Sequence, residues 1–290
     1  MQPITVIKIG GGEGIDLQPI CDEVAQLVRA GQRIVLVHGG SHETNTLSER
    51  LGHPPRTIVS PSGHTSRRTD RQTLDTFTMV YCGRINKRVV EDLRRLGVDA
   101  IGLSGIDGGL WTGERKKAIR AVEDGRTVLI RDDLSGKVIS VDATLLTMLL
   151  ESERTPVLTP PAVTADGVAI NVDADRAAAI TASKLEAETL LLLSNVPGVL
   201  ADPDDPDSLI ADANSAGHDT VRAAAKGRMK NKVLAAEEAI TGGVSRVIIG
   251  SANGERAIGN ALQGSGTVYT NQQSTGGIEF TLSNTIAEQI

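Results

Sequence analysis

The sequence has few aromatic residues, and this shortage limits both what the chain can bind and how its core is built. Phe, Tyr and Trp together make up 2% of the 290 residues. Surfaces that stack the bases of single-stranded nucleic acid need aromatic side chains, and a net charge of −6 offers no general attraction for a phosphate backbone. We therefore expect no nucleic-acid partner and a core of Val, Ile, Leu and Ala.

Cysteines and long apolar runs are scarce as well. Cys21 and Cys82 are too few for a disulfide framework or a zinc site, and we interpret them as small buried side chains in a reducing compartment. No run of about 18 apolar residues occurs, so no membrane span is predicted. The first residues also lack the apolar core of a secretory signal. These absences predict a cytoplasmic protein without a membrane partner.

Short segments rich in Val and Ile alternate with amphipathic segments along most of the chain. The predicted strands are Ile4–Ile9, Arg33–Val37, Asp99–Leu103, Thr155–Leu158, Thr189–Leu193 and Ser245–Ile249. The predicted helices include Leu17–Ala30, Arg71–Leu96, Ala174–Lys184 and Met229–Thr241. Such alternation is typical of an α/β protein whose mainly parallel sheet is covered by helices on both faces.

Three stretches depart from this alternation. Residues 110–141 alternate apolar and polar residues around turn signals at Glu123-Asp124-Gly125 and Ser135-Gly136, which predicts β-hairpins projecting from the main sheet. The acidic, proline-containing residues 202–207 predict an exposed loop. Residues 271–290 begin with a polar run typical of a disordered or linker segment, and their role is not readable from the sequence.

A glycine-rich turn follows each of the first two predicted strands. The first is Gly10–Gly12, two residues after Lys8, and the second is Gly39 and Gly40, followed by Ser41. Neighbouring parallel strands end at one edge of a sheet, where glycine backbone N–H groups and a helix N-terminus attract anions. A single turn of this kind is often purely structural. Two of them beside a lysine predict a site for a chain of phosphates.

Other nucleotide-binding patterns fit poorly. Ile15 stands where the dinucleotide fingerprint requires its third glycine, which argues against a dehydrogenase with a Rossmann sheet. The P-loop pattern and the protein-kinase motifs are also missing from the sequence.

Two later motifs place charged residues at the starts of predicted helices. Residues 171–175, NVDAD, precede one helix, and capping by Asp173 explains part of this motif without any ligand. Residues 227–232, GRMKNK, place lysines in a first helical turn, where they oppose the helix dipole. A bound phosphate would explain these lysines.

Three smaller features remain open at this point. The residues after the strand at 189–193 lead into a glycine turn that suits a nucleotide base. Arg67, Arg68 and Arg71 form either a clamp for a substrate carboxylate or a solvated surface. His38 and His42 have the spacing of a metal pair, but no third ligand is evident and we expect no metal site.

In chain order, these motifs resemble the amino acid kinase family over about residues 3–270. The shared features are the KIGGG and HGG turns, Asn86-Lys87, Ser104-Gly105-Ile106-Asp107-Gly108, NVDAD and the last lysine of GRMKNK. The chain resembles acetylglutamate kinases, and still more the branch of lysine and arginine biosynthesis whose substrate is aminoadipate or glutamate on an amino-group carrier protein. Ser41 replaces a usual third glycine and Asn195 a common Asp, which argues against simple acetylglutamate kinase activity. Acetylglutamate kinase and a non-catalytic nucleotide sensor remain the alternatives.

The resemblance implies a three-layer αβα sandwich and an ATP-dependent phosphorylation of a side-chain carboxylate. Residues 1–185 would form an N-terminal lobe that binds the acyl substrate and builds a homodimer, and residues 186–270 a C-terminal lobe that binds ATP. Mg²⁺ would be carried on the phosphates. The catalytic residues implied are Lys8, Lys232 and Asp175, of which Asp175 orients the two lysines.

The resemblance also implies two sets of binding residues. The ATP-binding set is Gly11, Gly12, Gly40, Ser194, Asn195, Gly198 and Met229. The substrate-binding set is Gly39, Gly40, Ser41, Arg67 and Asn171.

The segment 113–131 is unusually basic for a chain with a net negative charge. Its basic residues include Arg115, Lys116, Lys117 and Arg120, against few acids. One interpretation is a solvated hairpin face. The other is a docking surface for a small acidic carrier protein that bears the substrate.

Overall fold

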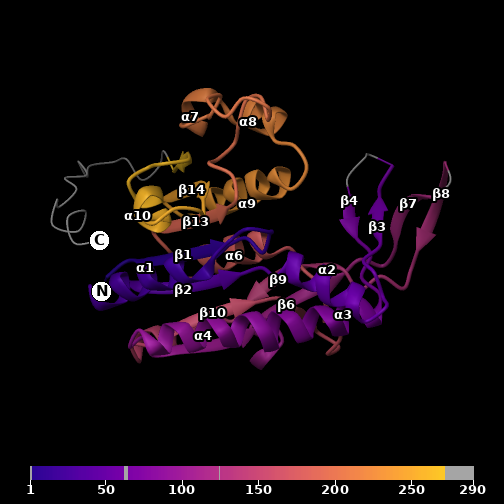
Figure 1. Cartoon of the computed structure of the whole chain (residues 1–290), viewed down its shortest axis with the longest axis horizontal. Helices are drawn as coiled ribbons and strands as arrows, with labels where there is room; N and C mark the ends of the chain where they lie inside the picture. Colours follow the sequence, from indigo (N-terminus) through magenta and orange to yellow (C-terminus); the bar gives the residue numbers. More distant parts are fainter. Residues whose placement is uncertain (1, 62–64, 124, 272–290) are drawn as a thin grey trace.

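A seven-stranded sheet forms the centre of the fold in the computed structural model, which describes residues 2–61, 65–123 and 125–271 (Figure 1). In spatial order its strands are β15 (Thr267–Thr270), β14 (Arg246–Ser251), β13 (Thr189–Ser194), β1 (Ile4–Ile9), β2 (Arg33–His38), β10 (Thr155–Thr159) and β5 (Ala100–Ser104). All neighbouring strands are parallel except β14 and β15. The expected mainly parallel sheet is therefore confirmed, and each predicted strand coincides with an observed one to within one or two residues.

Helices cover both faces of this sheet, as alternate burial along β13 shows. Leu190 and Leu192 belong to one apolar core, whereas Leu191 and Leu193 belong to the other. The first core is shared with α5 (Ala143–Glu151), α6 (Ala174–Lys184) and α9 (Met229–Thr241). The second is shared with α1 (Leu17–Arg29), α3 (Arg71–Thr78), α4 (Asn86–Arg95) and α10 (Ala257–Leu262). Two cores separated by one sheet make the predicted three-layer αβα sandwich.

The helix predicted over Arg71–Leu96 is interrupted in the structure. A π-helical segment, Met79–Ile85, joins α3 to α4. Within it Tyr81 is buried and stacks on Phe77 of α3, with ring centroids 3.7 Å apart. Single π-helical turns inside α-helices often occur at functional sites, and here the segment brings an aromatic pair to the carboxyl edge of the sheet.

Smaller β-elements accompany the central sheet, and two hairpins among them project beyond that edge (Figure 1). A second sheet has the order β12 (Ala169–Ile170), β11 (Ala162–Thr164), β6 (Trp111–Arg115) and β9 (Gly136–Val141). The hairpins β3 (Thr57–Val59) with β4 (Thr65–Arg67), and β7 (Ile119–Glu123) with β8 (Arg126–Ile130), stand side by side in Figure 1. The hairpin predicted at Glu123-Asp124-Gly125 is confirmed by the pairing of β7 with β8.

The turn predicted at Ser135-Gly136 is wrong. β9 begins at Gly136 and pairs antiparallel with β6, on the far side of the β7–β8 hairpin in sequence. A Cβ atom at Gly136 would lie 2.5 Å from the carbonyl oxygen of Glu114. This glycine therefore permits a close approach of two strands rather than a chain reversal.

Three further helical elements are short. α7 (Ala213–Ala216) and α8 (His218–Ala224) lie above α9 in Figure 1, and a 3₁₀ turn at Asp107–Gly109 follows β5. Residues 202–207 are exposed, as predicted.

No helix in the described part of the chain is long and apolar enough to cross a membrane. The prediction for 271–290 falls, apart from Asn271, outside the described residues.

The central sheet runs through both predicted lobes. Strands β1, β2, β10 and β5 precede residue 186, and β13, β14 and β15 follow it. The division into lobes at residue 185 stays a prediction.

Candidate active site

The two glycine turns touch each other at the carboxyl ends of β1 and β2. These strands are parallel neighbours, with Ile9 opposite His38. A Cβ atom at Gly11 would lie 1.9 Å from the backbone nitrogen of Gly40, so only glycine fits there. The backbone N–H of His42 donates to the carbonyl of Gly11 at 2.9 Å. The two turns thus form one backbone cradle, and α2 (Ser41–Arg50) begins at its edge.

Beside this cradle, one carboxylate lies between two ammonium groups. Lys8 comes from the end of β1, Asp175 from the first turn of α6 and Lys232 from the first turn of α9. The Lys8 Nζ atom lies 2.6 Å from Oδ1 of Asp175, and the Lys232 Nζ atom lies 2.9 and 3.1 Å from its two oxygens. The three residues are only 5%, 8% and 6% exposed. We call these three residues the charge cluster.

Burial and mutual attraction oppose each other in the charge cluster. Burial alone would raise the pKa of Asp175, but Lys232 and then Lys8 outweigh it and hold that pKa well below its usual range. Burial would lower the pKa of Lys8, and Asp175 reverses this effect. Burial lowers the pKa of Lys232 to about 8, against the pull of Asp175 and with the help of Lys8. Two ammonium groups share one carboxylate, so the cluster keeps a positive charge that suits phosphate oxygens.

Contacts between α6 and α9 hold the charge cluster in place. Asp173 caps α6 by accepting from the backbone N–H of Arg176 at 3.0 Å, which confirms the capping interpretation. Its other carboxylate oxygen accepts from Nδ2 of Asn231 in α9 at 2.8 Å. Arg176 also donates from Nε to Glu238 of α9 at 2.9 Å. Asp173 therefore aligns the helices that carry Asp175 and Lys232.

A pocket of about 620 Å³ opens above the cradle and the charge cluster. The β3–β4 hairpin contributes Thr65 and Ser66 to its lining, and the start of α9 contributes Met229. The predicted site residues that line it are Lys8, Gly11, Gly12, Gly39, Ser41, Arg67, Asn171, Asp175, Ser194, Asn195, Gly198, Met229 and Lys232. The predicted Gly40 is not in the lining but packs directly behind Gly11.

One end of the pocket has a polar atom without a partner. Ser194 ends β13, and its buried hydroxyl has no hydrogen-bond partner among the described residues. The following turn is tightly packed: a Cβ atom at Gly198 would lie 2.6 Å from the Leu209 side chain, and the N–H of Val199 donates to the Thr267 hydroxyl at 2.8 Å. A buried hydroxyl of this kind usually has a partner, so this end of the pocket fits a polar ligand such as a nucleotide.

The other end is built around Ser41 and Arg67. Nη2 of Arg67 donates to the carbonyl of Ser41 at 3.0 Å. Asn171 lines the same region and donates from Nδ2 to the Thr69 hydroxyl at 3.1 Å. Of the three clustered arginines, only Arg67 lines the pocket. Arg68 pairs with Asp132, and Arg71 with Asp75.

The four predicted docking residues divide into three groups. Lys116 lines the pocket. Lys117 and Arg120 are exposed next to and within β7. Arg115 instead points into the protein, where Nε donates to the carbonyl of Asp133 at 2.8 Å. Its guanidinium is therefore used within the chain.

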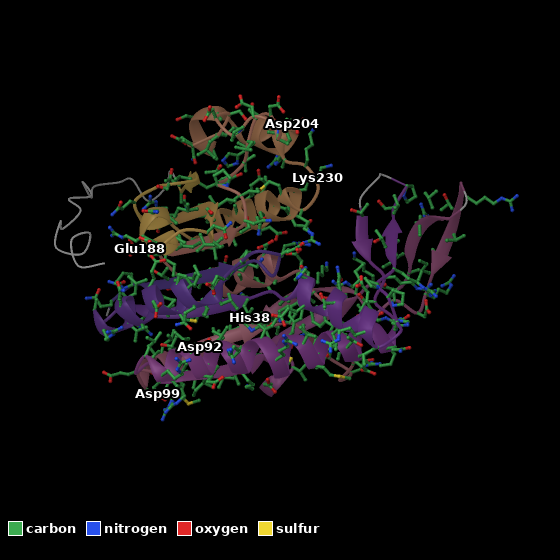
Figure 2. The ribbon with its side chains drawn as sticks, in the orientation of Figure 1. His38, Asp92, Asp99, Glu188, Asp204 and Lys230 are labelled. Atoms are coloured by element: carbon green, nitrogen blue, oxygen red, sulfur yellow. The ribbon has the colours of Figure 1, made fainter. Side chains whose placement is uncertain are left out.

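His38 has a structural position below the cradle. Figure 2 shows it in the middle of the molecule, and it is fully buried. Burial lowers its pKa to about 4, and its Nε2 atom accepts from Nδ2 of Asn86 at 3.2 Å. The same amide nitrogen donates to the carbonyl of Val157 at 2.9 Å. Among the described residues, no group of three His, Cys, Asp or Glu side chains is placed to hold a metal ion.

Several residues that line the pocket carry no clear functional signal in the sequence. Phe77 and Tyr81 are among them, and their only sequence signal is helical periodicity. Lys226 and Arg228 also line the pocket, and Arg228 belongs to the GRMKNK stretch, of which the lysines and Met229 were singled out but not the arginine.

The model of the amino acid kinase family matches residues 3–251. The chain belongs to the amino acid kinase family. A relative from Deinococcus radiodurans named LysW-aminoadipate kinase is 52% identical over 265 residues, which cover 91% of each chain. A protein of the same name from Thermus thermophilus is 48% identical over 91% of this chain and 98% of its own. An acetylglutamate kinase from Methanopyrus kandleri is 38% identical over 91% and 98% of the two chains.

Solved structures of other amino acid kinase-like proteins show the same fold. The N-acetylglutamate synthase of Neisseria gonorrhoeae superposes with a TM-score of 0.72 at 24% identity, over 92% of this chain and 59% of its own. The carbamate kinase of Giardia lamblia, bound to AMP-PNP, gives a TM-score of 0.64 at 16% identity, over 93% and 98%. The expected family and its αβα fold are both confirmed.

Proposed function

We propose that this protein is an ATP-dependent kinase that phosphorylates the side-chain carboxylate of 2-aminoadipate held on an amino-group carrier protein, with carrier-linked glutamate as a second acceptor. The observation that carries the proposal is the charge cluster of Lys8, Asp175 and Lys232 beside the double glycine cradle. The names of the relatives at 52% and 48% identity support the choice of substrate. The product would be an acyl phosphate for amino-acid biosynthesis.

The chemistry needs control of charge rather than a general base. A side-chain carboxylate has an ordinary pKa near 4.3, so it is already ionised and nucleophilic at neutral pH. In the transfer, a carboxylate oxygen forms a bond to the γ-phosphorus while the bond from that phosphorus to the β,γ-bridging oxygen breaks. ATP supplies the phosphoryl group when bound, and Mg²⁺ carried on its phosphates neutralises part of their charge.

The residues of the chain provide the remaining stabilisation. Gly11 and Gly12 line the pocket, with Gly40 packed behind Gly11. Their backbone N–H groups would bind the transferring phosphoryl oxygens. Lys8 lies on the cradle side of Asp175 and stabilises negative charge on the phosphoryl group. Lys232 neutralises the charge that develops on the departing ADP. Asp175 holds both ammonium groups in position beside the phosphates. Preorganised charges of this kind are effective because they need no rearrangement during the reaction.

The rest of the pocket is assigned by the same proposal. Ser194, Asn195, Gly198 and Met229 bind the nucleotide. Gly39, Ser41, Arg67 and Asn171 bind the acyl substrate, with Arg67 on its α-carboxylate. The N-terminal lobe would form a homodimer, as expected from the resemblance.

The carrier would dock beside the β7–β8 hairpin, close to the pocket mouth. Lys117 and Arg120 are exposed there, and Lys116 lies between this surface and the pocket. We define Lys117 and Arg120 as the docking surface. Arg115 is left out, because its guanidinium is bonded to backbone carbonyls of the same chain. A negatively charged carrier would be attracted to this surface, and its tethered substrate would enter the pocket past Lys116.

The direct test is trapping of the product with hydroxylamine, which converts acyl phosphates to hydroxamates. Enzyme, ATP and Mg²⁺ are incubated with carrier-linked aminoadipate, carrier-linked glutamate or free N-acetylglutamate. We expect hydroxamate from carrier-linked aminoadipate at the highest kcat/KM. A preference for free N-acetylglutamate would identify an acetylglutamate kinase instead. ATP binding without hydroxamate from any substrate would identify a nucleotide sensor and refute the proposal.

A further inference from the structure

Two arginines approach Ser41 from opposite sides of the pocket. Arg67, at the end of β4, donates from Nη2 to the Ser41 carbonyl at 3.0 Å. Arg228 precedes α9, far along the chain, and its Nη1 atom lies 3.4 Å from the Ser41 hydroxyl. That hydroxyl in turn donates to the carbonyl of Gly11 at 2.9 Å. Ser41 therefore joins the cradle to a basic group from each side of the pocket.

These two guanidinium groups have no carboxylate partner among the described residues. The neighbouring Arg68 and Arg71 do have one, in Asp132 and Asp75. Burial lowers the pKa of Arg67, and the nearby positive charge of Arg228 lowers it further. Both arginines line the pocket. Two like charges that converge in a pocket without a counter-ion favour the binding of an anion between them.

We infer that Arg228 and Arg67 together form the subsite for the α-carboxylate of the acyl substrate, so that this carboxylate is bound from both sides of the pocket. The inference rests on the proposed function and adds a substrate-binding residue to it. A planar carboxylate accepts paired hydrogen bonds from guanidinium groups, which suits two arginines better than two lysines.

The position of the subsite distinguishes it from the phosphate site. The phosphate site has its own cations in Lys8 and Lys232 and its own backbone donors in the glycine cradle. Arg228 instead contacts Ser41, which Arg67 also contacts. On this ground the proposal assigns the substrate carboxylate, rather than a phosphate of ATP, to the space between the arginines.

The subsite also couples the two substrates. Arg228 lies four residues before Lys232, at the start of the helix that carries Lys232. A carboxylate held by Arg67 and Arg228 would draw the start of α9 toward α2, and with it the cation that serves the nucleotide. Each substrate should then tighten the binding of the other, because coupling between two sites is reciprocal.

The test compares three variants: Arg228→Gln, Arg228→Lys and Lys230→Gln. Lys230 is the matched control, because it is exposed in the first turn of the same helix, carries the same charge and does not line the pocket (Figure 2). We expect Arg228→Gln to raise KM for carrier-linked aminoadipate about 10- to 100-fold, as for a lost charge-assisted hydrogen bond, with KM for ATP changed less than about threefold. Arg228→Lys should recover part of the loss, and Lys230→Gln should behave like wild type.

Binding measurements complete the test. Calorimetry with the carrier-linked substrate, with and without a non-hydrolysable ATP analogue, should show mutual tightening in the wild type and its loss in Arg228→Gln. Equal behaviour of Arg228→Gln and Lys230→Gln would overturn the inference. An increase confined to KM for ATP would also overturn it, by placing Arg228 on a phosphate.

The inference and the proposed function fail in different ways. If the wild type phosphorylates only free N-acetylglutamate, the proposed substrate is wrong. The same three variants then decide the subsite with that compound, which has an α-carboxylate of the same kind. If no substrate is turned over, binding of N-acetylglutamate to Arg228→Gln and Lys230→Gln decides it without catalysis.

Discussion

The two ends of the pocket handle charge in opposite ways. At the phosphate end, Lys8 and Lys232 are buried and share the carboxylate of Asp175. At the acyl end, Arg67 and Arg228 contact Ser41 but no carboxylate among the described residues. At the phosphate end, one carboxylate already neutralises half of the positive charge before a ligand binds. At the acyl end, the anion has to come from the ligand.

This difference follows from what each end must do. Groups that stabilise a transition state have to be in place beforehand, and a buried carboxylate keeps two ammonium groups from repelling each other. Groups that recognise a substrate contribute more binding free energy if the substrate itself supplies their missing counter-ion. Stability should therefore depend on the phosphate end, and substrate affinity on the acyl end and the docking surface.

Asp175→Asn should have the largest effect, because it removes the shared carboxylate and leaves two buried ammonium groups without a counter-ion. We expect a loss of about 3 kcal/mol in the free energy of unfolding at neutral pH, near the low end for a broken buried pair, since Lys232 can release its proton. Urea unfolding measures this. Asp142→Asn is the control, because Asp142 caps α5 without contacting the cluster and asparagine also caps helices. Equal unfolding midpoints for the two variants would show that the cluster is not a stabilising unit.

Lys8→Met should separate catalysis from stability. It removes one ammonium group, while Lys232 still pairs with Asp175. We expect kcat to fall about 100- to 1000-fold, with a smaller loss of stability than Asp175→Asn causes. Rate and thermal unfolding are measured on the same preparation. Activity within about tenfold of wild type, a barrier change of only about 1.4 kcal/mol, would remove Lys8 from the catalytic role.

The pH profile should show the phosphate end losing its charge. The pKa of Lys232 is lowered to about 8, so the free enzyme keeps this cation below that pH and loses it above. We expect kcat/KM for ATP to be level below about pH 8 and to fall about tenfold per pH unit beyond it. The fall in kcat should begin at higher pH, because bound phosphates favour the protonated amine. A level kcat/KM up to pH 10 would contradict the assignment.

Changes at the docking surface should have the smallest effect. We expect Lys117→Glu combined with Arg120→Glu to raise KM for carrier-linked substrate roughly threefold to tenfold at low salt, with little effect at high salt or on KM for ATP. Lys184→Glu combined with Arg95→Glu is the control, since both residues are exposed at helix ends and neither lines the pocket. If the two double variants give the same KM at low salt, the carrier docks elsewhere.

Much of the fold could be predicted because the sheet is buried on both faces. Strands such as Thr189–Ser194 are continuously apolar, and this local signal marks them clearly. The order of β6 and β9 could not be predicted, because Ser135-Gly136 has the composition of a turn. Gly136 instead permits a close contact between the two strands. This contact is seen only in the structure, where the carbonyl oxygen of Glu114 lies next to Gly136.

The same division applies to the site. Lys8 lies near the end of a predicted strand and the glycines follow two predicted strands, so the sequence places them at one edge of the sheet. The division of the three arginines between pocket and surface depended on where Asp75 and Asp132 came to lie.

By itself, the sequence determined six strands of the central sheet, the two glycine turns and the residue types available for phosphate chemistry, because strand burial and tight turns are encoded locally. Only the tertiary structure decided which charges meet. Lys8, Asp175 and Lys232 are far apart in the chain and come together because α6 and α9 pack side by side on β1 and its neighbours. The approach of Arg67 and Arg228 to Ser41 has the same origin, since long-range packing brings the end of β4 and the start of α9 to the same edge of the sheet.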